Sequence, residues 1–132
     1  MTPIIAMQPE HRAFVVCTWA KSASYGLRRP ATFRLVDRVL DDSGARVVCI
    51  AHGRTVHAWA CGDGDVLHYA YTAPELDPTT GVSLLRGRGL ARRLITELFG
   101  EYPEHITTSH EWPRESARFR YVPNLLLTRT AA

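Results

Sequence analysis

The chain has 132 residues, of which 45% are hydrophobic and 22% charged. This length and composition predict a single globular domain spanning residues 1–132 and exclude wholesale disorder. The formal net charge of +3 is small and spread along the chain, so charge alone does not indicate a nucleic-acid-binding protein. Lys21 is the one lysine among the 16 basic residues. The arginine excess suits phosphate or carboxylate recognition, but codon bias in a GC-rich genome is the preferred explanation.

The sequence predicts a cytoplasmic protein. No apolar run approaches the roughly 20 residues that span a bilayer, and residues 1–10 lack the basic and apolar regions of an export signal. The cysteines, Cys17, Cys49 and Cys61, are odd in number and form no C-x-x-C pair. We therefore expect reduced core thiols and neither a disulfide framework nor a zinc site.

The first third of the chain predicts a strand followed by two helices. Residues 3–7 are apolar and read as an edge strand. Residues 10–24 and 31–40 carry apolar side chains at helical spacing, the second segment ending at the Asp-Asp-Ser-Gly turn of residues 41–44.

The middle third predicts three antiparallel strands. Residues 46–51, 55–61 and 66–72 are rich in β-branched and aromatic side chains. Short turns at residues 52–54 and 62–65 join them, which is typical of a meander.

The last third predicts a loop at residues 73–85, an amphipathic helix from Leu90 to about Gly100, a strand at 105–109, a helix at 113–120 and a strand at 121–128. The resulting order is β-α-α-β-β-β-α-β-α-β. We expect an α+β fold with a mixed, mostly antiparallel central sheet flanked by helices.

The entry to the amphipathic helix is the segment best suited to bind an anion. Gly87 and Gly89 allow positive φ and close approach of the backbone. The N–H groups of residues 88–91 lie where the helix dipole favours a phosphate, and Arg86, Arg88 and Arg92 add charge at the rim. The segment is neither a Walker A loop, since no lysine is near, nor a Rossmann fingerprint, since the preceding strands form a meander.

The residues Arg86, Gly89 and Ala91 match the pattern [R/Q]-x-x-G-x-[G/A]. In this position, between a meander and a helix, the sequence resembles the GNAT superfamily of N-acetyltransferases, and its order of elements is similar along nearly the whole chain. The resemblance implies that this loop binds the pyrophosphate of acetyl-CoA, the co-substrate. The implied contacts come from Arg86, Gly87, Arg88, Gly89, Leu90 and Ala91.

The resemblance also implies contacts on both sides of that loop. The backbone of Tyr71, Thr72 and Ala73 would hydrogen-bond the pantetheine arm, with an N–H near Thr72 polarising the thioester carbonyl. Many family members carry N-x-x-A-x-x-x-Y before the last strand, and here Ala117 and Tyr121 keep that spacing. Arg114 replaces the asparagine and is expected to reach a phosphate instead, while Tyr121 is the expected general acid.

His68 is the expected general base, because an imidazole titrates near neutral pH and the arylalkylamine branch of the family carries a strand histidine at this place. By strict alternation His68 would share a face with Val66, Ala70 and Thr72 and lie opposite its tyrosine neighbours. A structural role for His68 and Tyr121 stays open, as does proton relay through water. Weaker alternatives to His68 as the base are the carboxylates of Glu75, Asp77 and Glu111. Trp19, Lys21 and Tyr25 are candidates for lining the acceptor site, with a core position as the preferred alternative for Trp19.

The resemblance implies an enzyme that moves an acetyl group from acetyl-CoA to an amine by direct attack in a ternary complex. The acceptor would be a small molecule or a protein, and homodimers are common in the family. Strings such as VLHYAYTAPE and ITTSHEWP also resemble short acetyltransferase-like proteins of tailed bacteriophages, which implies a bacterial or infected-host cytoplasm. The alternative is a non-catalytic protein of this fold that binds a host protein or nucleic acid.

Overall fold

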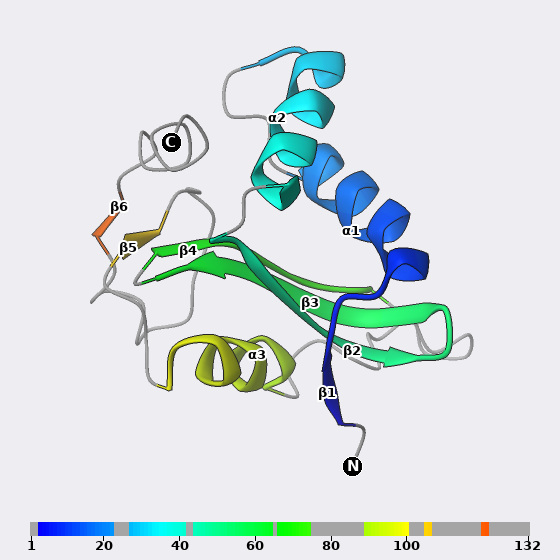
Figure 1. Ribbon diagram of the computed structural model, residues 1–132, viewed down its shortest axis with the longest axis vertical. Helices are drawn as coiled ribbons and strands as arrows, with labels where there is room; N and C mark the ends of the chain where they lie inside the picture. The colour runs from blue at the N-terminus through cyan, green and yellow to red at the C-terminus, as the bar shows by residue number, and fades with distance from the viewer. Residues whose placement is uncertain are drawn as a thin grey trace.

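The computed structural model describes residues 3–22, 27–41, 44–64, 66–74, 89–100, 105–106 and 120–121, the last two pairs through their backbone. The described strands form one sheet in the order β1-β2-β3-β4-β5-β6 (Figure 1). The elements are β1 (Ile4–Ala6), α1 (Pro9–Ser22), α2 (Arg29–Asp41), β2 (Arg46–His52), β3 (Thr55–Asp63), β4 (Val66–Thr72), α3 (Leu90–Phe99), β5 (His105–Ile106) and β6 (Arg120–Tyr121).

The sheet is mixed, as the sequence predicted. The strands β1 to β4 pair antiparallel, whereas β5 pairs parallel with β4 and β6 parallel with β5. Helices α1 and α2 cover one face and α3 covers the other (Figure 1). The expected α+β class with a mostly antiparallel central sheet is confirmed.

The face covered by α1 and α2 holds large aromatic side chains. Trp19 of α1 and Trp59 of β3 are both fully buried, and their ring centroids lie 5.5 Å apart. Helix α1 presents one stripe to this core because its buried residues recur at helical spacing. Those residues are His11, Val15, Val16, Trp19 and Ala20.

The face covered by α3 is built from small residues. On β3 the side chains of Ala58 and Ala60 point toward α3 and pack with Leu94 and Leu98. Gly62 continues this row: a Cβ atom there would collide with the ring of Phe99. Short side chains on the sheet let the helix lie close to it, which is why this face needs alanine and glycine.

Two polar contacts fix the helices to their surroundings. The Arg12 guanidinium bridges α1 to α2 through Asp37 and Asp41, at 3.2 and 2.9 Å. The buried His11 accepts the N–H of Gln8 at its Nδ1 (3.1 Å), so its Nε2 donates to the Gly53 carbonyl (2.8 Å). These contacts tie α1 to α2 and to the β2–β3 turn.

The ends of several elements differ from the predictions. The first helix begins one residue earlier and is described to Ser22. Arg120 was expected at the end of a helix but belongs to β6, where its backbone pairs with His105. The expected helix at 113–120 and strand at 121–128 otherwise lie outside the described residues. Within the described part of the chain, no helix is both long and apolar enough to cross a membrane.

Candidate functional site

A β-bulge places His68. Cys61 and Gly62 are neighbours on β3, yet they pair with Tyr69 and Leu67 of β4, so His68 is an extra residue between two paired positions. A bulge interrupts the alternation of side chains. The expectation that His68 shares a face with Ala70 is therefore wrong, because its ring lies with that of Tyr69 beside α1.

The His68 ring is stacked against Trp19. The two ring centroids are 6.5 Å apart with an angle of 24° between the planes, and the His68 side chain is 1% exposed. Trp19 also stacks on Tyr69, at 6.1 Å and 8°. The Trp59 ring also contacts those of Trp19 and Tyr69, and its indole N–H donates to the Thr18 hydroxyl at 2.9 Å. We call the rings of Trp19, Trp59, His68 and Tyr69 the aromatic wall. Trp19, expected as a candidate for lining the acceptor site, is instead a fully buried core residue that contacts His68.

At the C-terminal end of β4, one side of the strand pairs with β3 and the other side faces away from β3. The Ala73 N–H donates to the His57 carbonyl of β3 at 2.8 Å, and Thr72 pairs with Ala58. In an antiparallel ladder the hydrogen-bonding residues alternate. The N–H and C=O of Tyr71 and Ala73 therefore face β3, whereas those of Thr72 face the opposite side of the strand.

The described pairing between β4 and β5 lies at the other end of the strand. It joins Val66 to His105 and Leu67 to Ile106. The outward backbone of Thr72 is thus several residues beyond the described β5 contact. Of Tyr71, Thr72 and Ala73, Thr72 is the residue whose backbone N–H and C=O point away from β3.

Helix α3 begins at a glycine with left-handed backbone. Gly89 has φ 74° and ψ 19° and is the N-cap residue, with no side-chain cap bond. The first helical hydrogen bond runs from the Arg93 N–H to the Gly89 carbonyl at 3.0 Å. The first-turn amides are consequently those of Leu90, Ala91 and Arg92, slightly further along the chain than residues 88–91.

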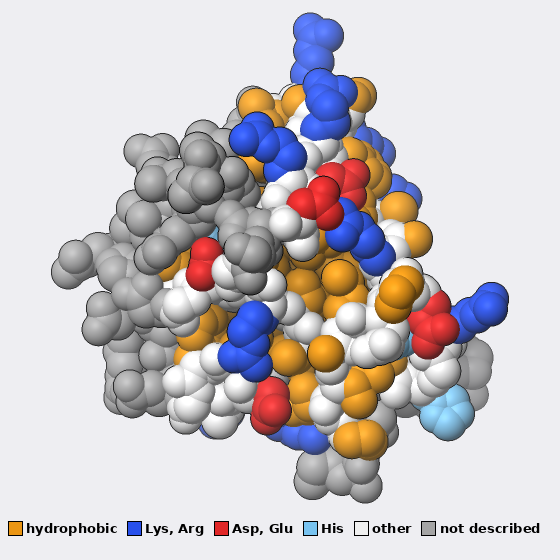
Figure 2. All heavy atoms as spheres, in the orientation of Figure 1, with side chains coloured by type: hydrophobic (Ala, Val, Ile, Leu, Met, Phe, Trp, Pro, Cys, Tyr) orange, Lys and Arg blue, Asp and Glu red, His pale blue; other side chains and the backbone are white. Residues whose placement is uncertain are grey.

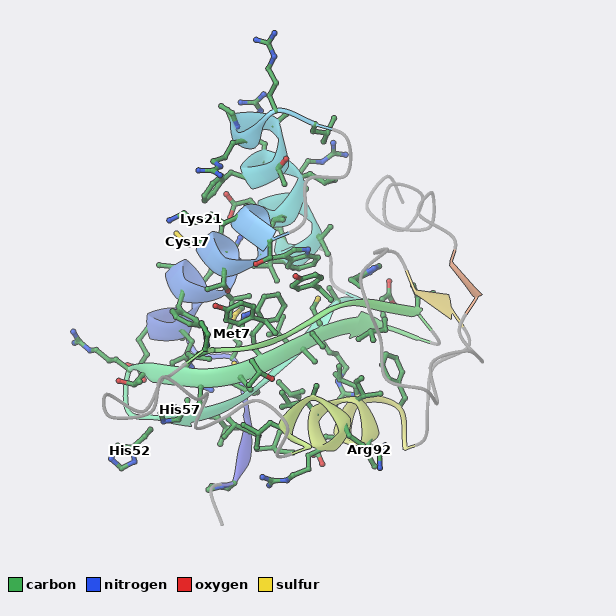
Figure 3. The ribbon with its side chains drawn as sticks, turned by 180° about the vertical axis from the view of Figure 1, so that it is seen from behind. Met7, Cys17, Lys21, His52, His57 and Arg92 are labelled. Carbon is green, nitrogen blue, oxygen red and sulfur yellow. The ribbon has the colours of Figure 1, made fainter. Side chains whose placement is uncertain are left out.

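The charges in this first turn suit a bound anion. The turn has no acidic residue and carries Arg92 and Arg93. Cations at a helix N-terminus oppose the dipole, typically by about 0.3–1 kcal/mol each, whereas an anion there is stabilised. Arg92 on α3 and Lys21 at the end of α1 lie on opposite sides of the sheet (Figure 3).

The other expected site residues lie outside the described part of the chain. These are Arg86, Gly87, Arg88 and Arg114, together with the carboxylate alternatives Glu75, Asp77 and Glu111 and the acceptor candidate Tyr25. Tyr121 has its backbone in β6, and its side chain is not described. The roles expected for these residues stay predictions. Of the expected site residues, the structure describes the side chain of His68, the backbone of residues 71–73 and the start of α3.

The buried thiols are poorly suited to nucleophilic catalysis. Burial raises the pKa of Cys49 to about 11. Burial, with a smaller contribution from Asp63, also raises the pKa of Cys61. Both thiols are protonated at neutral pH and lack thiolate reactivity. Among the described residues, no three histidine, cysteine or acidic side chains gather where they could hold a metal ion.

Comparison with known proteins supports the fold. No family model matches the chain, and no curated protein matches its sequence. The structure resembles the crystal structure of a ribosomal-protein-alanine N-acetyltransferase from Brucella melitensis biovar Abortus 2308, with a TM-score of 0.54 and 14% sequence identity. The match covers 88% of this chain and 84% of that one. The chain therefore has a GNAT-like mixed α+β fold.

Proposed function

We propose that the protein is an N-acyltransferase that moves an acetyl group from acetyl-CoA to an amine. The observation that carries this proposal is the start of α3. Gly89 opens the helix in a left-handed conformation, and the following turn offers amides and two arginines where other helices favour acids. This turn follows the meander in the chain, in a fold shared with an N-acetyltransferase. A pyrophosphate is the anion that such a turn accommodates.

The edge of β4 supports the same proposal, because it would bind the pantetheine arm of acetyl-CoA. The outward N–H and C=O of Thr72 suit the amides of a pantetheine arm, which extends like a strand. An arm bound along β4, with its pyrophosphate at α3, would carry the thioester toward the bulge at His68. The proposed site thus binds mainly through backbone groups and leaves proton transfer to side chains.

The chemistry needs one bond formed and one broken. The amine nitrogen attacks the thioester carbonyl carbon, the C–N bond forms, and the C–S bond then breaks. His68, directly or through a water, accepts the proton that the amine loses, and Tyr121 gives a proton to the departing thiolate. An N–H of β4 stabilises the oxyanion between these steps. Most of the rate enhancement comes from positioning the two reactants.

Thermal unfolding with acetyl-CoA tests the proposal directly. A ligand at about 100 times its dissociation constant stabilises the fold by roughly 2.7 kcal/mol, and we expect Tm to rise by about 10 °C. Pantetheine, which lacks the pyrophosphate, should give a much smaller rise. An unchanged Tm at millimolar acetyl-CoA would refute the proposed acyltransferase activity and favour a non-catalytic protein of the same fold.

Replacing His68 by glutamine should separate binding from catalysis. Glutamine keeps hydrogen-bonding capacity in this buried position but is not a base, so we expect kcat to fall by about 10²–10⁴. The rise in Tm with acetyl-CoA should persist. Activity is measured as CoA thiol released with a panel of primary amines, including peptides with free N-termini.

The matched control is His52→Gln. His52 is exposed at the end of the β2–β3 hairpin, outside the proposed site (Figure 3). It should leave kcat unchanged. Equal activity of the His68 and His52 variants would show that His68 is not the base and that its place against Trp19 is structural.

A further inference from the structure

One threonine hydroxyl joins helix α1 to the aromatic wall. The Thr18 hydroxyl accepts the indole N–H of Trp59 at 2.9 Å, between positions that are 41 residues apart in the chain. Trp59 belongs to β3 and is fully buried. A buried indole N–H needs a partner, because leaving it without one is costly. This hydrogen bond therefore ties the middle of α1 to the sheet beneath it.

The chemistry of the groups fixes the direction of each hydrogen bond. An indole N–H can only donate, whereas a hydroxyl has one proton to give and lone pairs to accept with. The Thr18 Oγ1 lies 2.8 Å from the Phe14 carbonyl and 3.3 Å from the Val15 carbonyl, so its proton goes into its own helix. Its lone pairs then receive the Trp59 N–H. Serine could make both bonds, whereas valine, which is β-branched like threonine, could make neither.

The rings on both sides of this hydrogen bond lead to His68. Trp19 is the next residue after Thr18, and its ring stacks on the His68 imidazole at 6.5 Å. The Trp59 ring lies 5.5 Å from that of Trp19 and 5.6 Å from that of Tyr69, the residue that follows His68. A shift of α1 at Thr18 would move the Trp19 ring across the imidazole. A turn of the Trp59 ring would displace both of its neighbours.

We infer that Thr18 is a positioning residue for the candidate base His68. Its hydroxyl fixes the Trp59 ring and the place of α1 over the sheet, and the aromatic wall then holds the imidazole of the bulge in one orientation. Thr18 acts through Trp19 and Trp59 rather than on the reacting atoms. The inference rests on the proposed function, in which His68 accepts the proton of the amine.

Thr18→Val tests the inference through the steady-state kinetics. Valine keeps the β-branched shape, so α1 should stay intact. We expect kcat to fall by about tenfold, because small displacements of a catalytic group are costly. The KM for acetyl-CoA should change by less than about twofold, since the proposed pyrophosphate site is at α3, on the other face of the sheet. Thr18→Ser should recover most of the kcat. All rates are measured well below the Tm of each variant, so that lost stability alone does not lower them.

The matched control is Thr32→Val. Lys and Arg side chains gather over the outer surface of α2, at the top of Figure 2, whereas Thr32 is on the buried side of this helix and is 1% exposed. Its hydroxyl donates to the carbonyl of Arg28, four residues earlier, at 3.1 Å, as that of Thr18 donates to Phe14. The control removes the same hydroxyl from a buried helical position outside the aromatic wall. It should leave kcat unchanged.

NMR of the His68 ring reports its position without any acetyl transfer. In the wild type the ring current of the stacked Trp19 should displace the imidazole C–H resonances, and the bonded indole N–H of Trp59 should exchange slowly with solvent. In Thr18→Val the displacement should shrink and the exchange should become faster. In Thr18→Ser both should return toward the wild type.

Three results would overturn the inference. They are His68 resonances in Thr18→Val that match the wild type, equal losses of kcat in Thr18→Val and Thr32→Val, or a Thr18→Ser variant as impaired as Thr18→Val. A wild type that transfers no acetyl group would instead refute the proposed function. The ring resonances would still show whether Thr18 fixes the orientation of His68, so the two proposals can fail separately.

Discussion

Replacing Gly89 by aspartate should abolish the rise in Tm with acetyl-CoA while the unliganded protein stays folded. The new carboxylate would lie at the N-terminus of α3, where the pyrophosphate is proposed to bind, and the two anions repel. The left-handed φ of 74° adds strain for any side chain. An acid at this end of a helix offsets part of that strain through the dipole. We therefore expect a large loss of binding and a small loss of stability, both measured by thermal unfolding.

Gly53→Asp is a control matched in backbone and charge. Gly53 has φ 61° and, like Gly89, has open space around the position of a Cβ atom. The same substitution therefore brings a similar backbone strain and the same charge to the β2–β3 turn. The rise in Tm with acetyl-CoA should be as large as in the wild type. A persisting rise in Gly89→Asp would place the pyrophosphate elsewhere.

Replacing Trp19 by alanine should destabilise the protein by about 3–5 kcal/mol, the usual cost of removing a buried tryptophan. Trp19 is fully buried; its ring stacks on those of His68 and Tyr69 and is tilted against that of Trp59. Because small domains are stable by only about 5–15 kcal/mol, the variant should unfold at much lower urea. The free energy of unfolding is measured by denaturant titration followed by circular dichroism.

Leu27→Ala serves as the comparison, since an exposed side chain should change stability by no more than about 0.5 kcal/mol. A Trp19 variant as stable as the Leu27 variant would contradict the packing of the aromatic wall. Trp19→Phe should recover part of the stability. If Trp19 also positions His68, Trp19→Phe should lower kcat with little change in the KM for acetyl-CoA.

Local patterns predicted most of the described elements. The stripe of Leu90, Leu94 and Leu98 is typical of an amphipathic helix, and it packs on the sheet as expected. The turn residues of the meander predicted where its three strands begin because turns depend on a few neighbouring residues, although β2 and β3 end one and two residues later than expected. Gly89, which the sequence analysis singled out as allowing a positive φ, has one.

Features that depend on pairing between strands that are distant in the sequence were harder to predict. The bulge at His68 arises from how β3 and β4 are matched, and no glycine or proline marks it in VLHYAYT. Alternation alone therefore put His68 on the wrong face. Likewise, the backbone of Arg120 pairs with His105, a contact that helical spacing around residue 120 could not indicate. Sequence patterns thus assigned residues to helices and strands better than they predicted the orientation of the side chains.

The row of small residues on β3 has a consequence for how the site can evolve. Ala58, Ala60 and Gly62 set how closely α3 approaches the sheet. A larger side chain anywhere in the row would lift or tilt the helix as a rigid rod, and its far end would move with it. The turn at Gly89, where we propose that the pyrophosphate binds, would then lose its alignment with the edge of β4. Residues that take no part in the chemistry thereby fix the distance between the start of α3 and the edge of β4. Selection for acetyl-CoA binding should therefore also act on the size of these side chains.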